Sequence, residues 1–179
     1  MGPSIPVHLV PYDPRWPEIA ARHSAALEAI PGVFSSVQHI GSTSVPGLIA
    51  KPVVDLIALS PKLDLIDTHR PEIEALGYVW HGEFGVDGRR FCTLDNPETR
   101  ARVINLHCYQ LGSPHPSLQL AFRDYLLAFP DAAARYAEEK RRAMALFPDN
   151  STLYAAEKGT FIRATIERAL SWSGDRSAP

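Results

Sequence analysis

Residues 39–59 read HIGSTSVPGLIAKPVVDLIAL, and this stretch decides the fold. Its second part, Val53 to Leu59, is a nearly continuous apolar run of strand length, which is typical of a central strand covered on both faces. Its first part is a turn of glycine and small hydroxyl residues that follows a predicted strand at Ser35 to Ile40. Because side chains alternate along a strand, Asp55 shares one face with Val53 and Ile57. The stretch therefore predicts a buried strand that carries one carboxylate next to a small-residue turn.

The rest of the chain predicts an α/β (α+β) fold in which helices pack on a mixed sheet. Asp13 followed by Pro14 is an N-cap with a first-turn proline, and predicts a helix that ends before Pro31. The other expected elements are a short strand at Val7–Val10, a helix at Leu63–Leu76, and a meander of strands at Tyr78–His81, Arg89–Leu94 and Arg102–Tyr109. From Pro116 onward, apolar stripes at helical spacing predict a C-terminal layer of three helices, and Asn150 is read as a helix cap. We expect a single domain over residues 1–179.

The composition is that of a globular protein. At 179 residues, with 45% hydrophobic and 21% charged residues, the chain is long enough to bury a full core. A net charge of −2 provides no broad basic surface, so nucleic-acid binding is not expected. The chain shows 2 cysteines, no signal peptide and no apolar run of about 18 residues. We therefore expect a cytoplasmic protein that does not enter a membrane, with loose ends at Met1–Pro6 and Ser173–Pro179.

The turn Gly41-Ser42-Thr43 is a candidate phosphate site. Glycine lets the backbone approach a ligand, and small hydroxyl residues present N–H and O–H donors. The alternative is an ordinary Ser/Thr-rich turn that caps a helix. Asp55 favours the functional interpretation, because an ionised carboxylate in an apolar strand is unfavourable to bury without a partner. Asp55 is then either a metal ligand or base that faces a cleft, or a structural aspartate bonded to backbone or to an arginine.

Together these residues resemble a known family. The resemblance to the GrpB family signature lies in His39–Leu48 and Ala50–Asp55 and continues in Gly85–Phe91, Asn105–His107, Phe122–Leu126 and Tyr154–Ile162. That family is similar to the nucleotidyltransferase superfamily, in which a glycine-serine turn precedes a strand with metal-binding carboxylates. Related domains are joined to dephospho-CoA kinase, so the resemblance implies a nucleotidyltransferase-like fold and a link to nucleotide or coenzyme A metabolism. One position departs from the superfamily, because Ile57 stands where a second carboxylate is usual.

The predicted strand Arg102–Tyr109 is the expected source of further metal ligands. Asn105 and His107 share a face of it, and if that face points into the cleft they would replace the superfamily's third carboxylate. Asp55 with His107 would suit Zn or Mn better than an oxygen-only Mg site, so a divalent metal (Mg, Mn or Zn) is the expected cofactor. The alternative is a solvated strand face with an ordinary histidine.

Two lysines on apolar helical stripes indicate a cationic wall. Lys140 lies at helical spacing from Tyr136, and Lys158 lies at the same spacing from Tyr154. Taken singly, each would be a lysine that extends its ammonium group to solvent, but two such lysines beside Asp55 favour an anionic ligand. Further expected phosphate-binding residues are Lys51, Arg90 and Arg123, although Arg89 and Arg90 point to opposite faces of their strand and at most one faces the cleft.

These observations favour a protein that binds a nucleotide or another phosphorylated small molecule and transfers a nucleotidyl group. Gly41 and Ser42 would hold phosphate, Asp55 would bind the cation and act as the catalytic residue, and the lysines with an arginine would neutralise charge. One alternative is a non-catalytic nucleotide- or coenzyme A-related binding module, which Ile57 favours. The other is a folding accessory that acts through its helical surface, which the inward-facing lysines do not favour.

Overall fold

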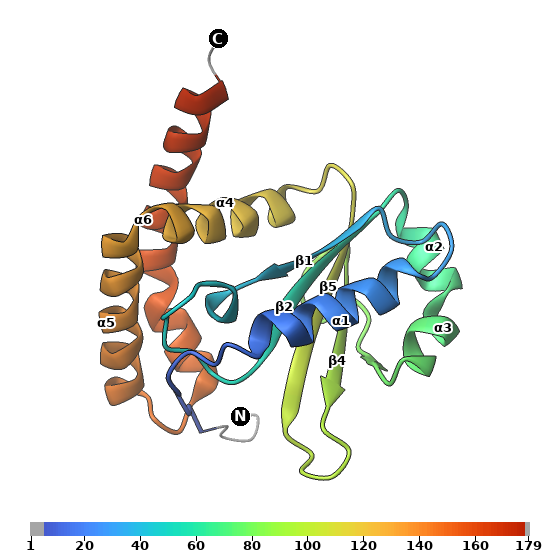
Figure 1. The fold of residues 1–179 in the computed structure, drawn as a ribbon, viewed down its shortest axis with the longest axis horizontal. Coiled ribbons are helices and arrows are strands. Elements are labelled where there is room, and N and C mark those ends of the chain that lie inside the picture. The colour runs from blue at the N-terminus through green and yellow to red at the C-terminus, as the bar shows by residue number, and fades with distance from the viewer. Residues whose placement is uncertain (1–5, 178–179) are drawn as a thin grey trace.

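A five-stranded mixed sheet with helices packed on it forms the body of the molecule (Figure 1). The structure is a computed structural model that describes residues 6–177, with side chains described up to Ser173. The strands are β1 (Ser36–Ile40), β2 (Val54–Ser60), β3 (Val79–Trp80), β4 (Arg89–Asp95) and β5 (Arg102–Gln110), in the spatial order β1-β2-β5-β4-β3. The helices are α1 (Trp16–Glu28), α2 (Leu63–Thr68), α3 (Arg70–Ala75), α4 (Pro114–Ala128), α5 (Pro130–Leu146) and α6 (Ser151–Ser177), with a 3₁₀ turn η1 (Ser42–Ser44). The predicted mixed α/β fold is confirmed.

The central position of β2 follows from its apolar sequence. It pairs antiparallel with β1 and parallel with β5, so both of its edges are hydrogen-bonded. Asp55 on β2 lies opposite Asn105 on β5, and Ile57 lies opposite His107. The predicted meander is also present, because β3, β4 and β5 pair antiparallel in succession. This register aligns the polar positions of neighbouring strands on one face of the sheet.

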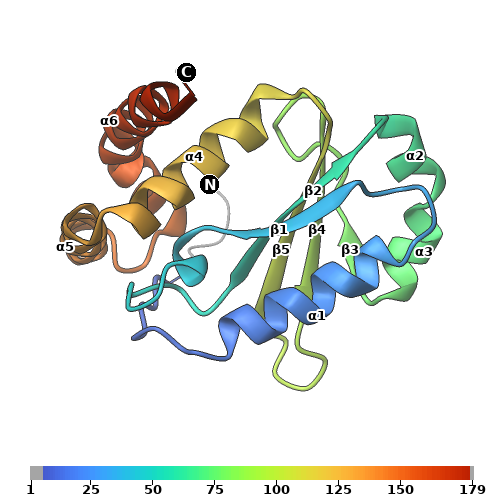
Figure 2. The ribbon, with the colours of Figure 1, turned by 45° about the horizontal axis from the view of Figure 1, so that its top comes forward.

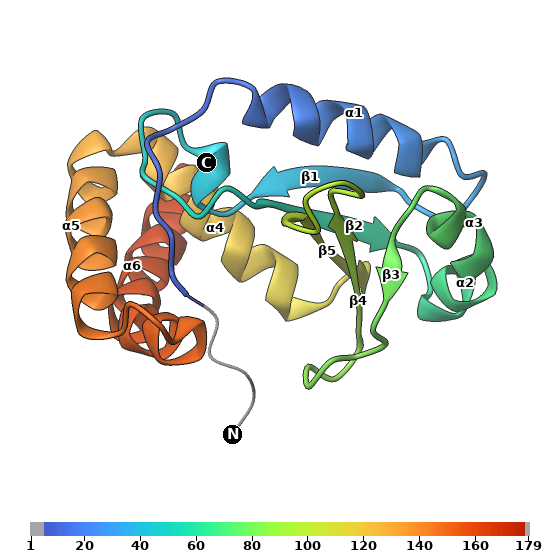
Figure 3. The same cartoon turned by 90° about the horizontal axis from the view of Figure 1, so that it is seen from below.

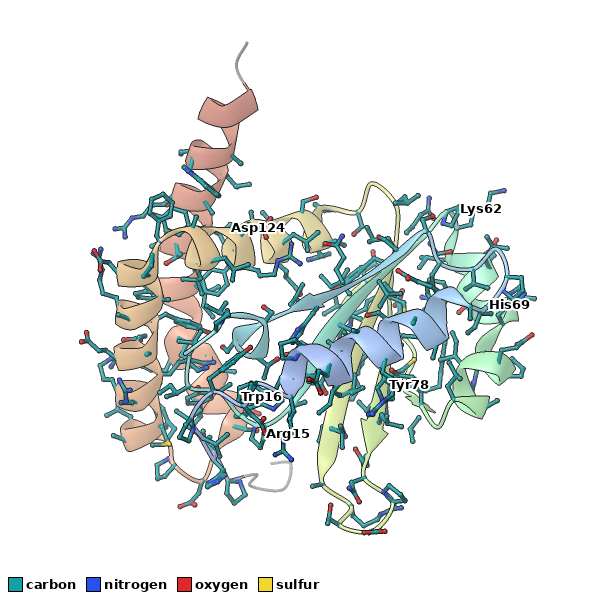
Figure 4. All side chains as sticks on the ribbon, in the orientation of Figure 1. Arg15, Trp16, Lys62, His69, Tyr78 and Asp124 are labelled. Carbon is teal, nitrogen blue, oxygen red and sulfur yellow. The ribbon has the colours of Figure 1, made fainter. Side chains whose placement is uncertain are left out.

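The other face of the sheet carries the main apolar core. Figure 2 shows α1 along this face, with α4 on the opposite side of β1. The strand residues buried on this face are Val37, Val54, Leu56, Ala58, Cys92, Ile104, Leu106 and Cys108. Trp16 at the start of α1 and Tyr78 beside that helix are labelled in Figure 4 and belong to the same core. Burial in this core raises the pKa of the Tyr78 hydroxyl, which lies 3.2 Å from Nδ1 of His23.

Helices α4, α5 and α6 form a wall beside one end of the sheet, as the apolar stripes predict. The loop that follows β1 lies between the sheet and these helices (Figure 3). Arg123 on α4 donates to the carbonyl oxygen of His39 at 3.0 Å and to Oε1 of Gln38 at 3.3 Å. These bonds fasten α4 to β1, and α5 and α6 pack against each other farther from the sheet (Figure 1).

Three details of the predicted elements are wrong. The expected helix Leu63–Leu76 is broken at His69 into α2 and α3, because Pro71 lacks the N–H that a continuous helix requires. The first helix begins at Trp16 rather than directly after Asp13, whose carboxylate instead accepts the N–H of Arg15 at 2.9 Å. The expected strand Val7–Val10 is reduced to one isolated bridge between Val10 and Ala50.

The C-terminal end of the chain differs from the expected loose segment. Helix α6 continues through Ser173 to Ser177, and residues 1–5 and 178–179 lie outside the described part. Asn150 caps α6 as expected, because its Oδ1 accepts the N–H groups of Thr152 and Leu153 at 3.1 and 3.0 Å. Among the described residues, no helix combines the length and apolarity needed to cross a membrane.

Candidate functional site

A cavity of about 580 Å³ opens between the sheet and the C-terminal helices. Asp55 and Asn105 line it from the sheet, the β1–β2 loop lines a second side, and α5 and α6 line a third. The charged side chains on its walls are Lys51, Asp55, Arg102, Lys140 and Lys158. A cavity of this size that meets several polar groups is typical of a small-molecule site.

Gly41 brings the backbone into contact with Asp55. Its φ is 73°, in the left-handed region, and a Cβ atom at this position would lie 2.7 Å from Oδ2 of Asp55. Any larger residue would therefore be strained by its backbone and would also collide with the carboxylate. The glycine of the predicted turn is required by the position of Asp55.

Internal hydrogen bonds hold the turn in place. The Ser44 hydroxyl donates to the Gly41 carbonyl oxygen at 2.6 Å, and the Thr43 hydroxyl lies 2.9 Å from Nε2 of His39. Burial, opposed by the charge of Asp55, lowers the pKa of His39 to about 4, so its ring is neutral at physiological pH. Thr43 thus lines the cavity while its hydroxyl is bonded to His39, and Ser42 lines the cavity beside it.

Asp55 is held by its neighbours on β5. Nδ2 of Asn105 donates to Oδ1 of Asp55 at 2.9 Å, and Nε2 of His107 lies 3.9 Å from the same oxygen. Burial opposes ionisation, but the interactions with His107, Asn105 and Lys51 outweigh it and hold the pKa of Asp55 below its ordinary value. The Asp55 side chain is 30% exposed, so an ionised carboxylate faces the cavity.

Lysines from three parts of the chain converge on the cavity. Lys51 comes from the β1–β2 loop, Lys140 from α5 and Lys158 from α6. Lys140 is 2% exposed and donates from Nζ to the carbonyl oxygen of Ile49. Nζ of Lys158 lies 4.1 Å from the ring centroid of Tyr154, within the range of a cation–π contact. Among the described residues, no carboxylate lies within 4.0 Å of any of these ammonium groups.

The pKa values of Lys140 and Lys158 lie below the ordinary value for lysine. Burial, together with the charge of Lys158, lowers the pKa of Lys140 to about 7. Burial, together with the charge of Lys51, lowers the pKa of Lys158 to about 8. Asp55 opposes both shifts without cancelling them. An anion in the cavity would relieve this repulsion, because it stabilises the charged form of each lysine.

Two tyrosines on the cavity wall were not predicted as site residues. Tyr136 and Tyr154 fall on apolar stripes, and the sequence assigns them to the core. The signal that points to them is that Lys140 and Lys158 share those stripes. Oη of Tyr154 is buried without a hydrogen-bond partner among the described residues. Arg102, bonded to Asp95 and to Oδ1 of Asn105, was expected only as a strand residue.

Two predicted phosphate-binding arginines are not brought to the cavity. Arg90 lies on the core side of β4, opposite Cys108, where it forms a two-bond ion pair with Asp67. Arg89 lies on the Asp55 side of the strand, with Nη1 3.5 Å from Nδ1 of His107, and it does not line the cavity either. Arg123 is occupied in joining α4 to β1.

The residues around Asp55 do not fit the two-metal centre of the superfamily. Ile57 at the second carboxylate position is fully buried, and no described group of three or more His, Cys, Asp or Glu side chains could hold a metal ion. Asn105 turns its amide nitrogen to Asp55, while its oxygen accepts from Arg102 at 3.1 Å. Asp55 and His107 therefore supply at most two ligands. Positive charge in this cavity comes from lysines.

Comparison with known proteins places the chain among close relatives. A family profile described as GrpB protein matches residues 6–168. The UPF0157 protein YqkA of Bacillus subtilis is 31% identical over 176 residues, which is 98% of this chain and 50% of that protein. A dephospho-CoA kinase of Mycolicibacterium paratuberculosis is 31% identical over 194 residues, which is 94% of this chain and 47% of the kinase. The chain therefore spans about half the length of these two curated relatives.

A solved structure agrees with the sequence matches. The crystal structure of the conserved protein GrpB from Enterococcus faecalis has a TM-score of 0.84 and 34% identity, and the match covers 93% of this chain and 99% of that one. The family profile covers most of the chain, from Pro6 to Arg168. On these grounds the chain belongs to the GrpB family, as its Gly41-Ser42-Thr43 turn and Asp55 strand indicate.

Proposed function

We propose that this protein binds a phosphorylated small molecule, such as a nucleotide or a coenzyme A-type compound, in the cavity beside Asp55. The observation that carries the proposal is the excess of positive over negative charge on the cavity walls. Lys51, Lys140, Lys158 and Arg102 line the cavity, and Asp55 is the one carboxylate on its described walls. Lys140 is buried and Lys158 is half-buried, and the described protein provides no carboxylate partner for either ammonium group.

The chemistry of the walls matches a phosphate group. Ammonium groups act as point charges for phosphate oxygens, and each such bond is stronger than one between neutral groups. Aromatic rings of Phe122, Tyr136 and Tyr154 supply apolar surface for the organic part of the ligand. We infer that the phosphates lie near Lys140 and Lys158.

The choice of ligands to test follows from the relatives. One of them is named a dephospho-CoA kinase, and this chain corresponds to about half of it. Dephospho-CoA and coenzyme A therefore belong in a binding panel with inorganic phosphate, AMP and ATP. A ligand that binds the native state raises the melting temperature, so a thermal-shift series ranks the panel and calorimetry then gives affinities.

Variants of the lysines test the proposal directly. Lys140→Met and Lys158→Met should each weaken the best phosphorylated ligand by roughly tenfold or more, because each removes a charge-assisted bond. The matched control is Lys62→Met, since Lys62 is exposed at the end of the sheet away from the cavity (Figure 4). Equal affinities in all three variants would contradict phosphate binding in this cavity.

Asp55 provides the means to separate transfer from binding alone. Its lowered pKa keeps it ionised, so it can accept a hydrogen bond from an attacking hydroxyl group but is a weak base. Asp55→Asn should abolish any nucleotidyl transfer and retain or tighten phosphate binding, because it removes the negative charge from an anion site. Turnover that persists in this variant would exclude Asp55 as the catalytic residue.

The second candidate is a binding module without catalysis, and Ile57 is the residue that favours it. An isoleucine at the second carboxylate position removes a ligand on which two-cation transfer depends. If a divalent metal takes part, it must be shared between Asp55 and the phosphates of the ligand. We expect affinity for the best ligand to change less than about tenfold on adding a chelator, since lysines supply the charge. Abolished binding in chelator would instead favour the metal-bridged arrangement.

A further inference from the structure

A second group of rings lies on the same face of the sheet as Asp55, outside the cavity walls. We call it the aromatic shelf, and it consists of His81, Phe84, Phe91 and His107 with the guanidinium group of Arg89. Ring centroids are 5.6 Å apart for His81 and Phe84, 5.2 Å for Phe84 and Phe91, and 5.1 Å for Phe91 and His107. Phe91 lies opposite His107 in the β4–β5 ladder, which fixes the inner half of the shelf. The shelf reaches Asp55 through His107, whose Nε2 is 3.9 Å from Oδ1.

The outer ring of the shelf is held in an exposed position. Phe84 is 66% exposed, and its φ of 47° is in the left-handed region, which is unusual for a bulky residue. Its neighbours Gly82 and Gly85 also have positive φ, so the loop uses glycine for such positions elsewhere. Such a backbone is uncommon for a bulky residue, and Arg100 in the turn before β5 is the other non-glycine example among the described residues. At Phe84 this backbone presents an aromatic ring at the surface, stacked on Phe91.

The loop under Phe84 is rigidly bonded. Arg89 donates to the carbonyl oxygen of Phe84 at 2.7 Å and to that of Glu83 at 3.2 Å. Oε1 of Glu83 accepts the N–H of Gly88 at 2.9 Å. The ring of Phe84 is stacked on Phe91 with an interplanar angle of 24°, so its other face meets solvent.

The charges of the shelf are already in use. The Arg89 guanidinium group bonds two carbonyl groups and lies 4.9 Å from the Phe91 centroid, and the Glu83 carboxylate is bonded to backbone. The shelf therefore offers stacking surface rather than an anion site, in contrast to the lysine cavity. Flat aromatic rings stack on such surfaces with little regard to their hydrogen-bonding edges.

We propose that the aromatic shelf binds an uncharged planar aromatic ring of nucleobase type, on the side of Asp55 away from the lysines. The proposal that the shelf binds a ring depends only on the residues of the shelf. The proposal that this ring belongs to a second substrate rests on the phosphate-binding function proposed above. In that role a hydroxyl oxygen of the molecule on the shelf would attack a phosphorus atom of the molecule in the lysine cavity, next to Asp55. The new P–O bond would form as the P–O bond to the departing phosphate breaks, the departing phosphate would keep the electron pair, and the hydroxyl proton would pass to solvent beside Asp55. Holding two reactants in this way is a large part of what transfer catalysis requires.

Nucleosides without phosphate test the shelf separately from the cavity. Adenosine and uridine are titrated into the whole chain, with ribose as the control that lacks a ring, and the ring NMR signals of His81, Phe84 and His107 are followed. We expect adenosine to shift these signals by ring-current effects, and ribose to leave them unchanged. The signals should respond equally in Lys140→Met, because the shelf does not use that lysine.

Variants of Phe84 distinguish stacking from simple apolar contact. Phe84→Leu should weaken adenosine at least about fivefold, whereas Phe84→Trp should retain or strengthen binding. Val79→Ala, at an exposed position on the adjacent β3, is the matched control and should leave affinity unchanged. Circular dichroism and melting temperature confirm that each variant is folded.

The outcomes separate this inference from the proposed function. The shelf proposal is overturned if adenosine produces no shifts, if Phe84→Leu binds adenosine as the wild type does, or if the shifts are lost in Lys140→Met. The phosphate proposal survives each of these results, since it is tested with AMP and inorganic phosphate. Conversely, adenosine shifts that depend on Phe84 support the shelf even if no phosphorylated ligand binds.

Discussion

The face of the sheet beneath α1 and the face that opens onto the cavity are built from alternate residues of the same strands. On β5, Leu106 and Cys108 are buried in the apolar core, while Asn105 and His107, which alternate with them, lie beside Asp55. The face beneath α1 buries the apolar side chains on which folding depends. The face toward the cavity presents polar side chains that the apolar core does not need. Alternation along the strand thus allows the chain to stabilise the fold and to hold a charged site with adjacent residues.

Leu106→Ala should have the largest effect on stability. Leu106 is fully buried, so the variant should lose roughly 3 kcal/mol of unfolding free energy, through lost burial and the cavity left behind. Asn105→Ala, one residue away, should lose less than about 1 kcal/mol, because its side chain is partly exposed. Urea unfolding of the two variants measures the difference. Equal losses of unfolding free energy in the two variants would contradict the division into a stabilising apolar face and a polar site face.

Gly41→Ala should come next, because it affects backbone and site together. Its positive φ and a Cβ contact of 2.7 Å with Asp55 Oδ2 should destabilise the protein by roughly 1–3 kcal/mol and displace the carboxylate. Gly47→Ala is the matched control, since Gly47 has a φ of +78° but no atom within 4 Å of the added Cβ. Urea unfolding should show a larger loss for Gly41→Ala, and the excess should disappear when Asp55 is also replaced by alanine. An excess that persists in the double variant would mean that the close approach to Asp55 is not its cause.

Lys140→Met should have the smallest effect on stability, and in the opposite direction. Replacing a buried cation that has no carboxylate partner should raise the unfolding free energy at pH 7 by about 1 kcal/mol. The exposed control Lys62→Met should change it by less than about 0.5 kcal/mol. Chemical unfolding at pH 7 decides the sign. A clear loss of stability would mean that the Lys140 bond to Ile49 outweighs the unfavourable burial.

Much of this architecture is predictable from sequence because it depends on local periodicity. In the apolar run at Val53–Leu59, in the meander and in the helical layer, the spacing of apolar residues predicts the secondary structure. The turn at Gly41 follows from the family resemblance. Strand alternation places Asn105 and His107 on one face of β5, but the structure is what shows that this face meets Asp55. The break at His69 was not predicted, although Pro71 is a residue that interrupts helices.

The remaining errors concern contacts between distant elements. Which of Arg89 and Arg90 faces Asp55 depends on the register of β4 against β5, and the sequence states only that they point apart. Tyr154 and Lys158 share α6, but their place beside Lys51 depends on how α6 packs. The shelf likewise requires the 82–88 loop to fold back so that Phe84 stacks on Phe91. Such long-range placement has no periodic signal.

The central claim is that lysines of depressed pKa receive an anionic ligand, and proton uptake measures this most directly. At pH 8, Lys140 and Lys158, with pKa values of about 7 and about 8, are largely or half deprotonated in the free protein. An anion raises both pKa values, so binding takes up protons at this pH, and affinity falls as pH rises from 7 to 9. The phosphate of the ligand contributes little, because its second pKa is about 6.

Calorimetry of the best panel ligand at pH 8, in two buffers of different ionisation enthalpy, gives the number of protons directly. We expect an uptake of roughly one proton per ligand bound, and we expect this proton uptake to disappear in the Lys140→Met, Lys158→Met double variant. Binding enthalpies that are identical in the two buffers would contradict this expectation, because the anion would then be held without these lysines.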